Sequence, residues 1–239
     1  MLTKGSWSTI PLLPPNDSIF SLPACGLKSL NSYRDTELLL RTIPNLNVFR
    51  LAYRFIKIWA LASGIFSSRF GYLGGFHITL LLARICKLAD GDPKGVTAAK
   101  IVRLFFDHYS KIDWLTEIIY DPEFSVGARY QRFSREPMVI TSIHAPVVNV
   151  ARNATRHSIS ALTREFGLAE KALRSGQWDL RLMGRENEFL AEYGSYVKID
   201  VQYWGNALRR GKALALWVES TIPLLLVGLY EFSLQRDTY

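Results

Sequence analysis

Cysteine is scarce in this chain of 239 residues, which contains only Cys25 and Cys86. Two cysteines cannot form the dense disulfide framework of a small secreted domain, and the first residues lack the apolar core of a secretory signal. We therefore expect reduced thiols in an intracellular protein. In that setting the sequon at Asn153 is a chance match rather than a glycosylation site.

Long hydrophobic runs are also missing. The longest uncharged apolar stretches, residues 222–230 and 77–83, are far shorter than the ~20 residues that a membrane helix needs. The sequence therefore predicts no membrane span. Its 49% hydrophobic content is still enough for a genuine core, and its length permits one large or two small domains.

Motifs for several kinds of catalysis are absent. No Gly-x-Ser-x-Gly sequence marks a hydrolase nucleophile, and neither cysteine lies in the local sequence of a catalytic thiol. His77 precedes an apolar helix, where a core or capping role is more common than metal binding. We expect no structural zinc, because no cysteine or carboxylate lies at ligand spacing from the four histidines, which are His77, His108, His144 and His157.

Acidic residues are outnumbered by basic ones. The chain has 21 Asp and Glu against 29 Lys and Arg, a formal net charge of +8 and a pI near 9.5. This balance favours polyanionic partners, because clustered cations neutralise phosphates and release counterions. Charge alone does not separate RNA from an acidic membrane surface.

A cationic helix is the first part of the most informative segment. Apolar residues recur at the spacing of one helical face over residues 48–63. Another face of the same helix carries three basic residues, Arg50, Arg54 and Lys57.

A glycine-rich turn follows this helix. Gly71, Gly74 and Gly75 permit tight turns or a close approach of the backbone, and residues 76–88 are predicted to form a buried helix. Unpaired N–H groups at the start of such a helix favour an anion. The ordinary alternative is a solvated basic face beside a helix-helix turn. The glycine spacing matches neither the Walker pattern nor the dinucleotide-binding pattern.

The remaining pattern predicts further helices and one strand. Residues 1–23 contain four prolines and form an extended lead-in, and residues 96–109 form an amphipathic helix. Ser158 is a candidate cap for a helix over residues 158–173. Alternation over residues 197–203 predicts a half-buried strand, and the apolar helix after it is expected to kink or divide at Pro223.

An arginine-rich segment lies between two of these helices. Arg129, Arg132 and Arg135 alternate with Tyr130 and Phe133, a composition suited to phosphate contact and base stacking. A solvated loop is the alternative interpretation. Near the predicted C-terminal helix, Arg209, Arg210 and Lys212 are candidate contacts to an RNA backbone, although a solvated helix start explains them equally well.

Short motifs occur in one collinear order at residues 25–34, 40–45, 45–86, 120–122, 137–141, 149–155, 189–196 and 217–220. Together they resemble the central domain of eukaryotic poly(A) polymerases and, in the last two motifs, the opening of their RNA-binding domain. The resemblance covers roughly residues 25–231, and no single motif decides it. It implies a mainly α fold, with a helical-bundle central domain over residues 24–175 and a partial α/β RRM-like domain over residues 176–239. Such a domain has a multi-stranded sheet, so its RNA-binding face is expected to be incomplete here.

The resemblance also implies a nucleotide site. Asn31, Lys57, Gly74 and Gly75 match the family, and Lys57 takes the place of its phosphate-binding lysine. Four positions depart from the family pattern, which weakens polar contacts and narrows the adenine site: Phe66 replaces tyrosine, Ser68 replaces asparagine, Phe76 replaces valine, and Ala151 replaces serine or threonine.

Catalysis in this family uses carboxylates that hold two metal ions, and these lie in an N-terminal nucleotidyltransferase domain. We find no credible equivalent in this sequence. Gly5-Ser6 and Gly194-Ser195 lack a following pair of aspartates, and Asp90-Gly-Asp-Pro93 has the composition of an ordinary turn. No catalytic or metal-binding residue is therefore predicted, and the chain alone is expected to be inactive.

Two functional interpretations remain open. In the first, the protein contributes binding of ATP and of the RNA 3′ end to mRNA polyadenylation, when a catalytic domain is supplied. ATP is then the substrate, and the Mg²⁺ of the complete enzyme is not held by carboxylates of this chain. The implied partners are RNA, ATP, a nucleotidyltransferase domain or polyadenylation factors, and the implied location is the nucleus. The alternative is a diverged, non-catalytic relative that binds RNA or a protein.

Overall fold

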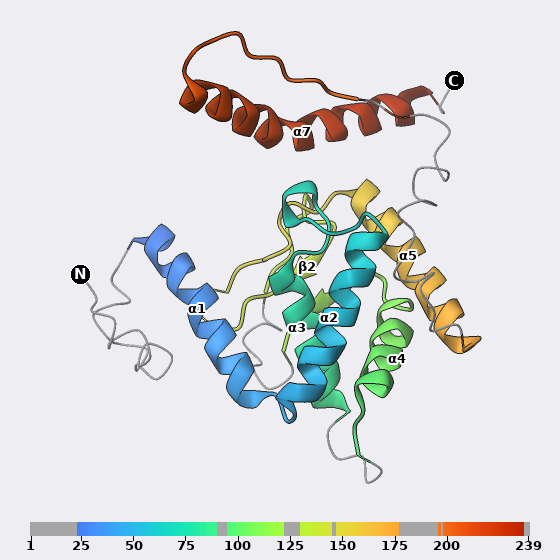
Figure 1. The fold of residues 1–239 in the computed structure, drawn as a ribbon. Coiled ribbons are helices and arrows are strands. Elements are labelled where there is room, and N and C mark those ends of the chain that lie inside the picture. The colour runs from blue at the N-terminus through green and yellow to red at the C-terminus, as the bar shows by residue number, and fades with distance from the viewer. Residues whose placement is uncertain are drawn as a thin grey trace.

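The described part of the chain is largely helical. A computed structural model describes residues 23–89, 95–121, 130–144, 147–176, 196 and 198–236 (Figure 1). This architecture confirms the predicted mainly α fold class. Its elements are α1 (Ala24–Thr42), α2 (Leu46–Ala62), η3 (Ser68–Phe70), α3 (Gly75–Leu88), α4 (Ala98–Tyr109), β1 (Ile118–Ile119), β2 (Val139–Ile140), α5 (Arg156–Arg174) and α7 (Leu208–Arg236).

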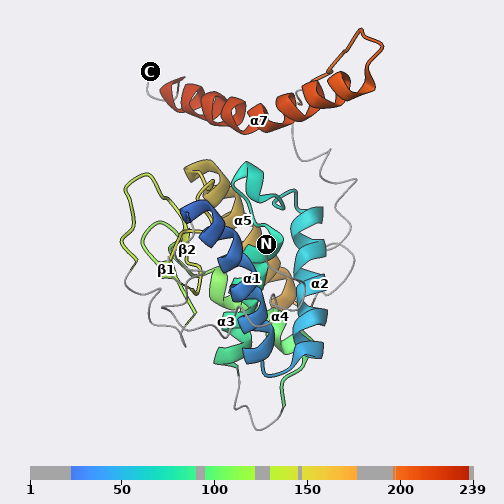
Figure 2. The ribbon, with the colours of Figure 1, turned by 90° about the vertical axis from the view of Figure 1, so that its left-hand side faces the viewer.

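Four helices enclose the main core. α2 packs on α3 and α4, and α4 packs on α5, so residues far apart in the sequence share one interior (Figures 1 and 2). Aromatic rings fill its centre. The Trp59 ring meets the Phe106 ring edge-on, with centroids 4.7 Å apart, and lies 5.2 Å from the Phe166 ring. All three side chains are at most 1% exposed, so their apolar area is almost entirely removed from water.

The helix predicted over residues 48–63 is confirmed as α2. It begins at Leu46 because the Asn45 side chain accepts hydrogen bonds from the N–H groups of Asn47 and Val48, each at 3.1 Å. The buried side of α2 is Phe49, Ala52, Ile56, Trp59 and Ala60, whereas Val48 and Phe55, which fit the same apolar spacing, are only partly buried.

α4 confirms the helix predicted over residues 96–109, with a start at Ala98. The Thr97 hydroxyl caps it by accepting a hydrogen bond from Lys100 N–H at 3.2 Å. Ala99 is exposed, because the buried side of α4 is centred on Ile101 and Phe105.

Ser158, the predicted cap of α5, takes part in capping but is not the N-cap residue. Thr155 is the N-cap residue, and its hydroxyl accepts from Ser158 N–H at 3.1 Å while the Ser158 hydroxyl accepts from Thr155 N–H at 2.9 Å. This reciprocal pair satisfies two N–H groups at once and begins the helix at Arg156.

A small parallel pair of strands and two buried carboxylates secure the loops. β1 pairs with β2 in the register Ile118 to Val139 and Ile119 to Ile140. Asp35 of α1 accepts hydrogen bonds from the N–H groups of Ile143 and His144, each at 3.0 Å. Lys87 and Asp121 form a buried ion pair at 2.8 Å, so α3 is joined to the segment that follows β1.

The predicted strand over residues 197–203 is not formed within its described part, residues 198–203, and residue 197 lies outside the described residues. Ile199, Val201 and Tyr203 are 48%, 44% and 38% exposed. A strand needs a neighbour for its backbone groups, and none of the described strands pairs with this segment. The structure therefore does not show the RRM-like sheet.

α7 is continuous through Pro223 rather than divided there. Figure 2 shows the helix bowed about its middle, which agrees with a proline that removes one backbone hydrogen bond. Arg69 of η3 and Glu219 of α7 lie 3.4 Å apart, in an exposed ion pair. None of the helices that the structure describes is both long enough and apolar enough to cross a membrane.

Candidate nucleotide-binding site

Lys57 lies on α2 beside the turn that leads to α3. Its Nζ atom is 5.5 Å from the centre of the Phe66 ring, a cation-π arrangement. An isolated parallel β-bridge pairs the backbone of Phe66 with that of Leu73, on the other side of η3. Lys57 and Phe66 therefore lie together, and the bridge to Leu73 links Phe66 to the residue before Gly74.

Gly71 makes the turn between η3 and α3 possible. Its φ of +79° is in the left-handed region, and a Cβ atom there would lie 2.5 Å from the carbonyl oxygen of Asn153. The Asn153 side chain donates from Nδ2 to the carbonyl oxygen of Ser68 at 3.0 Å. The turn is therefore fastened to the segment that precedes α5.

Gly74 and Gly75 allow close packing at the start of α3. A Cβ atom at Gly74 would lie 3.0 Å from Cβ of Ser68, and one at Gly75 would lie 3.0 Å from the hydroxyl oxygen of Tyr53. The close approach of the backbone that the sequence predicts therefore occurs, and the atoms approached belong to Ser68 and Tyr53. A further role in approach to a base or sugar remains a prediction.

Tyr53 is a neighbour of the site that the sequence argument missed. It precedes Lys57 by one helical turn, so both side chains extend from the same region of α2. Burial raises the pKa of Tyr53, and its hydroxyl therefore stays protonated and available as a donor near neutral pH. The sequence could have indicated Tyr53, because it lies four residues before Lys57 and so on the same side of the helix.

His77 fixes the first turn of α3. Its Nδ1 accepts from Gly74 N–H at 3.1 Å, and its Nε2 lies 2.9 Å from the carbonyl oxygen of Val150. Both contacts are satisfied when the proton is on Nε2. Burial lowers the pKa of His77, so the ring is neutral, and the predicted core or capping role is confirmed.

The α3 N-terminus, whose first residue Gly75 lies against the Tyr53 hydroxyl, leaves backbone donors without an intrahelical partner. The first backbone hydrogen bond of the helix runs from Ile78 N–H to Gly74 carbonyl oxygen, at 3.1 Å. The N–H groups of Gly75, Phe76 and His77 come before it and have no intrahelical acceptor. These N–H groups and the Lys57 ammonium are the candidate phosphate-binding surface, and its use by phosphate remains a prediction.

The other positions that the family resemblance implies for the nucleotide site differ in their exposure. Ser68 is exposed in η3 and Phe76 is partly buried in the first turn of α3, so both border this surface. Ala151 is 3% exposed, and the absence of a hydroxyl there removes no surface contact. Asn31 lies in α1, and the position of its side chain is outside what the structure describes.

The predicted RNA contacts fall into separate regions. Arg129 lies outside the described residues. Arg132 has a structural function, since its Nη2 donates to the carbonyl oxygen of Trp114 at 3.3 Å and to that of Glu117. Arg135 is exposed, and so are the α7 residues Arg209, Arg210 and Lys212.

Metal binding is assigned to none of these residues. Over the described ranges, no group of three or more His, Cys, Asp or Glu side chains could hold a metal ion. Cys86 is a buried free thiol whose pKa burial raises to about 12, so it does not act as a thiolate.

Comparison with known proteins decides the family. The poly(A) polymerase central domain matches residues 48–177. The chain belongs to the poly(A) polymerase family. The matched residues contain Lys57, the glycine-rich turn and all of α3, α4 and α5.

Two poly(A) polymerases are among its relatives. The poly(A) polymerase of Dictyostelium discoideum is 28% identical over 213 residues, covering 85% of this chain and 26% of the relative. Nuclear poly(A) polymerase 1 of Arabidopsis thaliana is 26% identical over 216 residues, covering 83% of this chain and 29% of the relative. This poly(A) polymerase family member therefore spans less than a third of either relative. The comparisons do not favour the alternative of a diverged, non-catalytic relative that binds RNA or a protein.

Proposed function

We propose that this chain supplies ATP binding and RNA 3′-end binding for template-independent adenylyl transfer, the reaction of mRNA polyadenylation. The observation that carries the proposal is the position of Lys57 over the Phe66 ring, which is bridged to Leu73 just before α3, within the segment that matches the family. ATP is the substrate, RNA the acceptor and the nucleus the proposed location, the last supported by the nuclear relative.

Each element of the site has a task in this proposal. The Lys57 ammonium neutralises phosphate charge, and the N–H groups of Gly75 and Phe76 donate to phosphate oxygens. Phe66 holds the lysine side chain near the turn, while Ser68 and Phe76 border the nucleotide. Asn31 contributes a further polar contact from α1.

The chemical step needs more than these residues. The RNA 3′ hydroxyl attacks the α-phosphate of ATP and pyrophosphate leaves, with charge stabilised by metal-bound oxygens. Because the described residues contain no suitable group of metal ligands, we assign the Mg²⁺-binding carboxylates to a nucleotidyltransferase domain that acts together with this one. Residues 24–175 form the nucleotide-binding unit in this proposal, and residues 176–239 the start of an RNA-binding unit.

Titration calorimetry with ATP and Mg²⁺ tests the proposal on the whole chain. Lys57→Ala should weaken ATP binding by at least about tenfold, because it removes a charge-assisted contact. Arg50→Ala is the matched control: it removes the same charge from an exposed position of α2 and should bind ATP as the unaltered chain does. Lys57→Arg should recover only part of the affinity, since a guanidinium is broader than an ammonium.

Two results would contradict the proposal. One is the absence of saturable ATP binding by the unaltered chain. The other is equal affinity in the unaltered chain and Lys57→Ala, which would place the nucleotide elsewhere. Circular dichroism spectra of all variants separate a lost contact from a lost fold.

A further inference from the structure

A second concave surface lies between the loop of residues 130–137 and the first turn of α5. It encloses about 460 Å³, within the range of small-molecule sites. The residues that determine its chemistry are Arg132, Phe133, Arg135, Glu136 and Arg156. Lys57 and the glycine-rich turn do not line it, so it is separate from the candidate nucleotide-binding site.

Glu136 holds the loop in shape rather than facing a ligand as a free carboxylate. It accepts hydrogen bonds from the Tyr130 hydroxyl at 2.9 and 3.0 Å, from Phe133 N–H at 3.0 Å and from Asn149 Nδ2 at 3.2 Å. Burial opposes ionisation of Glu136, but these donors outweigh it and lower its pKa. Among the described residues that line the pocket, the one carboxylate is thus occupied by protein donors.

Arg132 fixes the opposite side of the loop. Its contacts with the Trp114 and Glu117 carbonyl oxygens fasten the loop to the segment before β1, and its Nε and Nη1 atoms are buried. It therefore adds positive charge to the pocket wall while remaining a positioning residue.

Phe133, Arg135 and Arg156 are exposed at the pocket. Phe133 is 57% exposed, which is unusual for a large aromatic ring, and the Arg135 guanidinium carbon lies 5.7 Å from its centre. Arg156, in the first turn of α5, is also exposed. Among the residues that the structure describes, no ion pair joins Arg135 or Arg156 to a carboxylate.

We propose that this pocket binds one nucleotide of single-stranded RNA, with its base stacked on Phe133 and its flanking phosphates paired with Arg135 and Arg156. An exposed ring among unpaired cations is the combination that single-strand binding uses, because every base has a face that can stack. A phosphate group alone fills only a small part of this volume and makes no stacking contact with the Phe133 ring. This inference rests on the proposed function in one respect only, which is the identification of the bound strand as RNA.

Fluorescence anisotropy with a short labelled oligo(A) tests the site on the whole chain. Phe133→Ala should weaken binding by about tenfold, the value of one lost base stack. Arg135→Ala and Arg156→Ala should each weaken binding and reduce the salt dependence of the affinity by about 0.7, the slope expected for one single-strand phosphate contact. Arg174→Ala is the matched control, since it removes an exposed arginine from the other end of α5.

The outcomes separate this proposal from its alternatives. Unchanged oligo(A) affinity in all three pocket variants, or no saturable binding by the unaltered chain, would overturn it. If Phe133→Ala binds normally while inorganic polyphosphate competes equally well with oligo(A), the pocket is an anion site only, and the nucleotide assignment is wrong. Arg135→Lys, which keeps the charge, should retain most of the affinity and confirms that the loop is intact.

ATP calorimetry on the same variants distinguishes the two sites. The pocket variants should bind ATP normally, and Lys57→Ala should bind oligo(A) normally. A chain that binds oligo(A) through the pocket but does not bind ATP would contradict the proposed function and leave the RNA site standing.

Discussion

His77 shows how one side chain can set the geometry of a binding surface without touching a ligand. Its ring joins the start of α3 to Val150, and it does so only in the neutral form. A protonated ring would carry a hydrogen on Nδ1 facing the Gly74 N–H. The position of the α3 N–H groups is therefore linked to the protonation of this ring.

The linkage predicts a pH dependence of stability. Because burial lowers the folded pKa of His77 below 6.5, its contribution is complete above pH 6.5 and is lost as the pH falls through the folded pKa. Urea melts from about pH 7.5 to about pH 5 should show the free energy of unfolding of His77→Gln falling less steeply than that of the unaltered chain.

His108 is the natural comparison for that experiment. Its pKa is also lowered by burial, with a further contribution from Arg84, so His108→Gln should remove a separate part of the pH dependence. Equal pH dependence of the free energy of unfolding in His77→Gln and the unaltered chain would contradict the claim that the neutral His77 ring holds the start of α3.

Individual glycines illustrate what the sequence could and could not specify. A tight turn was predicted for the glycine-rich segment, and Gly71 meets that prediction with a positive φ. The identity of the neighbours of Gly74 and Gly75 was not predictable. Ser68 and Tyr53 reach them through the tertiary fold, and local spacing gives no information on such contacts.

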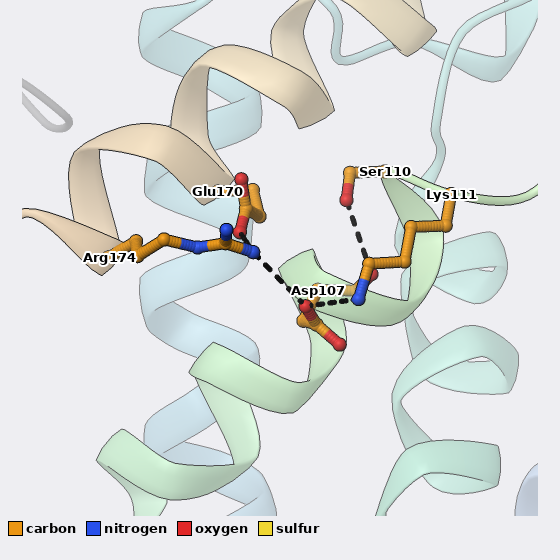
Figure 3. Close-up of polar contacts among 5 residues, drawn as sticks. All are labelled: Asp107, Ser110, Lys111, Glu170 and Arg174. Atoms are coloured by element: carbon orange, nitrogen blue, oxygen red, sulfur yellow. Dashed lines mark hydrogen bonds and ion pairs between the residues drawn. The ribbon is translucent and has the colours of Figure 1, made fainter.

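At the scale of elements, α4 and α5 are joined by both charge and aromatic packing. Figure 3 shows Asp107 of α4 between Lys111 and Arg174, at 2.6 and 3.8 Å, with Glu170 also paired to Arg174. The Asp107 side chain is 47% exposed, so water screens these pairs. Beneath them, the Phe166 ring is fully buried against α2 and α4.

These two kinds of contact should differ greatly in their effect on stability. Asp107→Ala should lower the free energy of unfolding by no more than about 1 kcal/mol, as is usual for exposed pairs. Phe166→Ala should lower it by about 3–5 kcal/mol, because it leaves a cavity in the centre of the core. Denaturant melts measure both, and a larger loss in Asp107→Ala than in Phe166→Ala would contradict this ranking.

Element boundaries were predictable where capping chemistry is local. The helices that became α2, α3 and α4 were predicted within two residues of their observed starts, since apolar periodicity and polar caps lie in the same stretch of chain. The start of α5 was also predicted within two residues, but its cap was assigned to Ser158 alone, whereas Thr155 and Ser158 cap it jointly.

At the scale of the whole molecule, the helical class and the family follow from the sequence, but the second domain does not. The alternating residues 198–203 stay extended and exposed, because strand formation depends on a partner that periodicity cannot supply. The division at residue 175 remains a prediction. α7 is long and largely exposed, with Trp217 63% and Leu224 73% accessible.

The central claim is that ATP binds where α2 meets the start of α3. The most direct measurement is photochemical labelling of the whole chain with an azido analogue of ATP, followed by mass spectrometry of the labelled peptides. We predict labelling within residues 57–76, protected by unlabelled ATP and lost in Lys57→Ala. Protected labelling that instead falls on the α4–α5 surface, or is unchanged in Lys57→Ala, would contradict the claim.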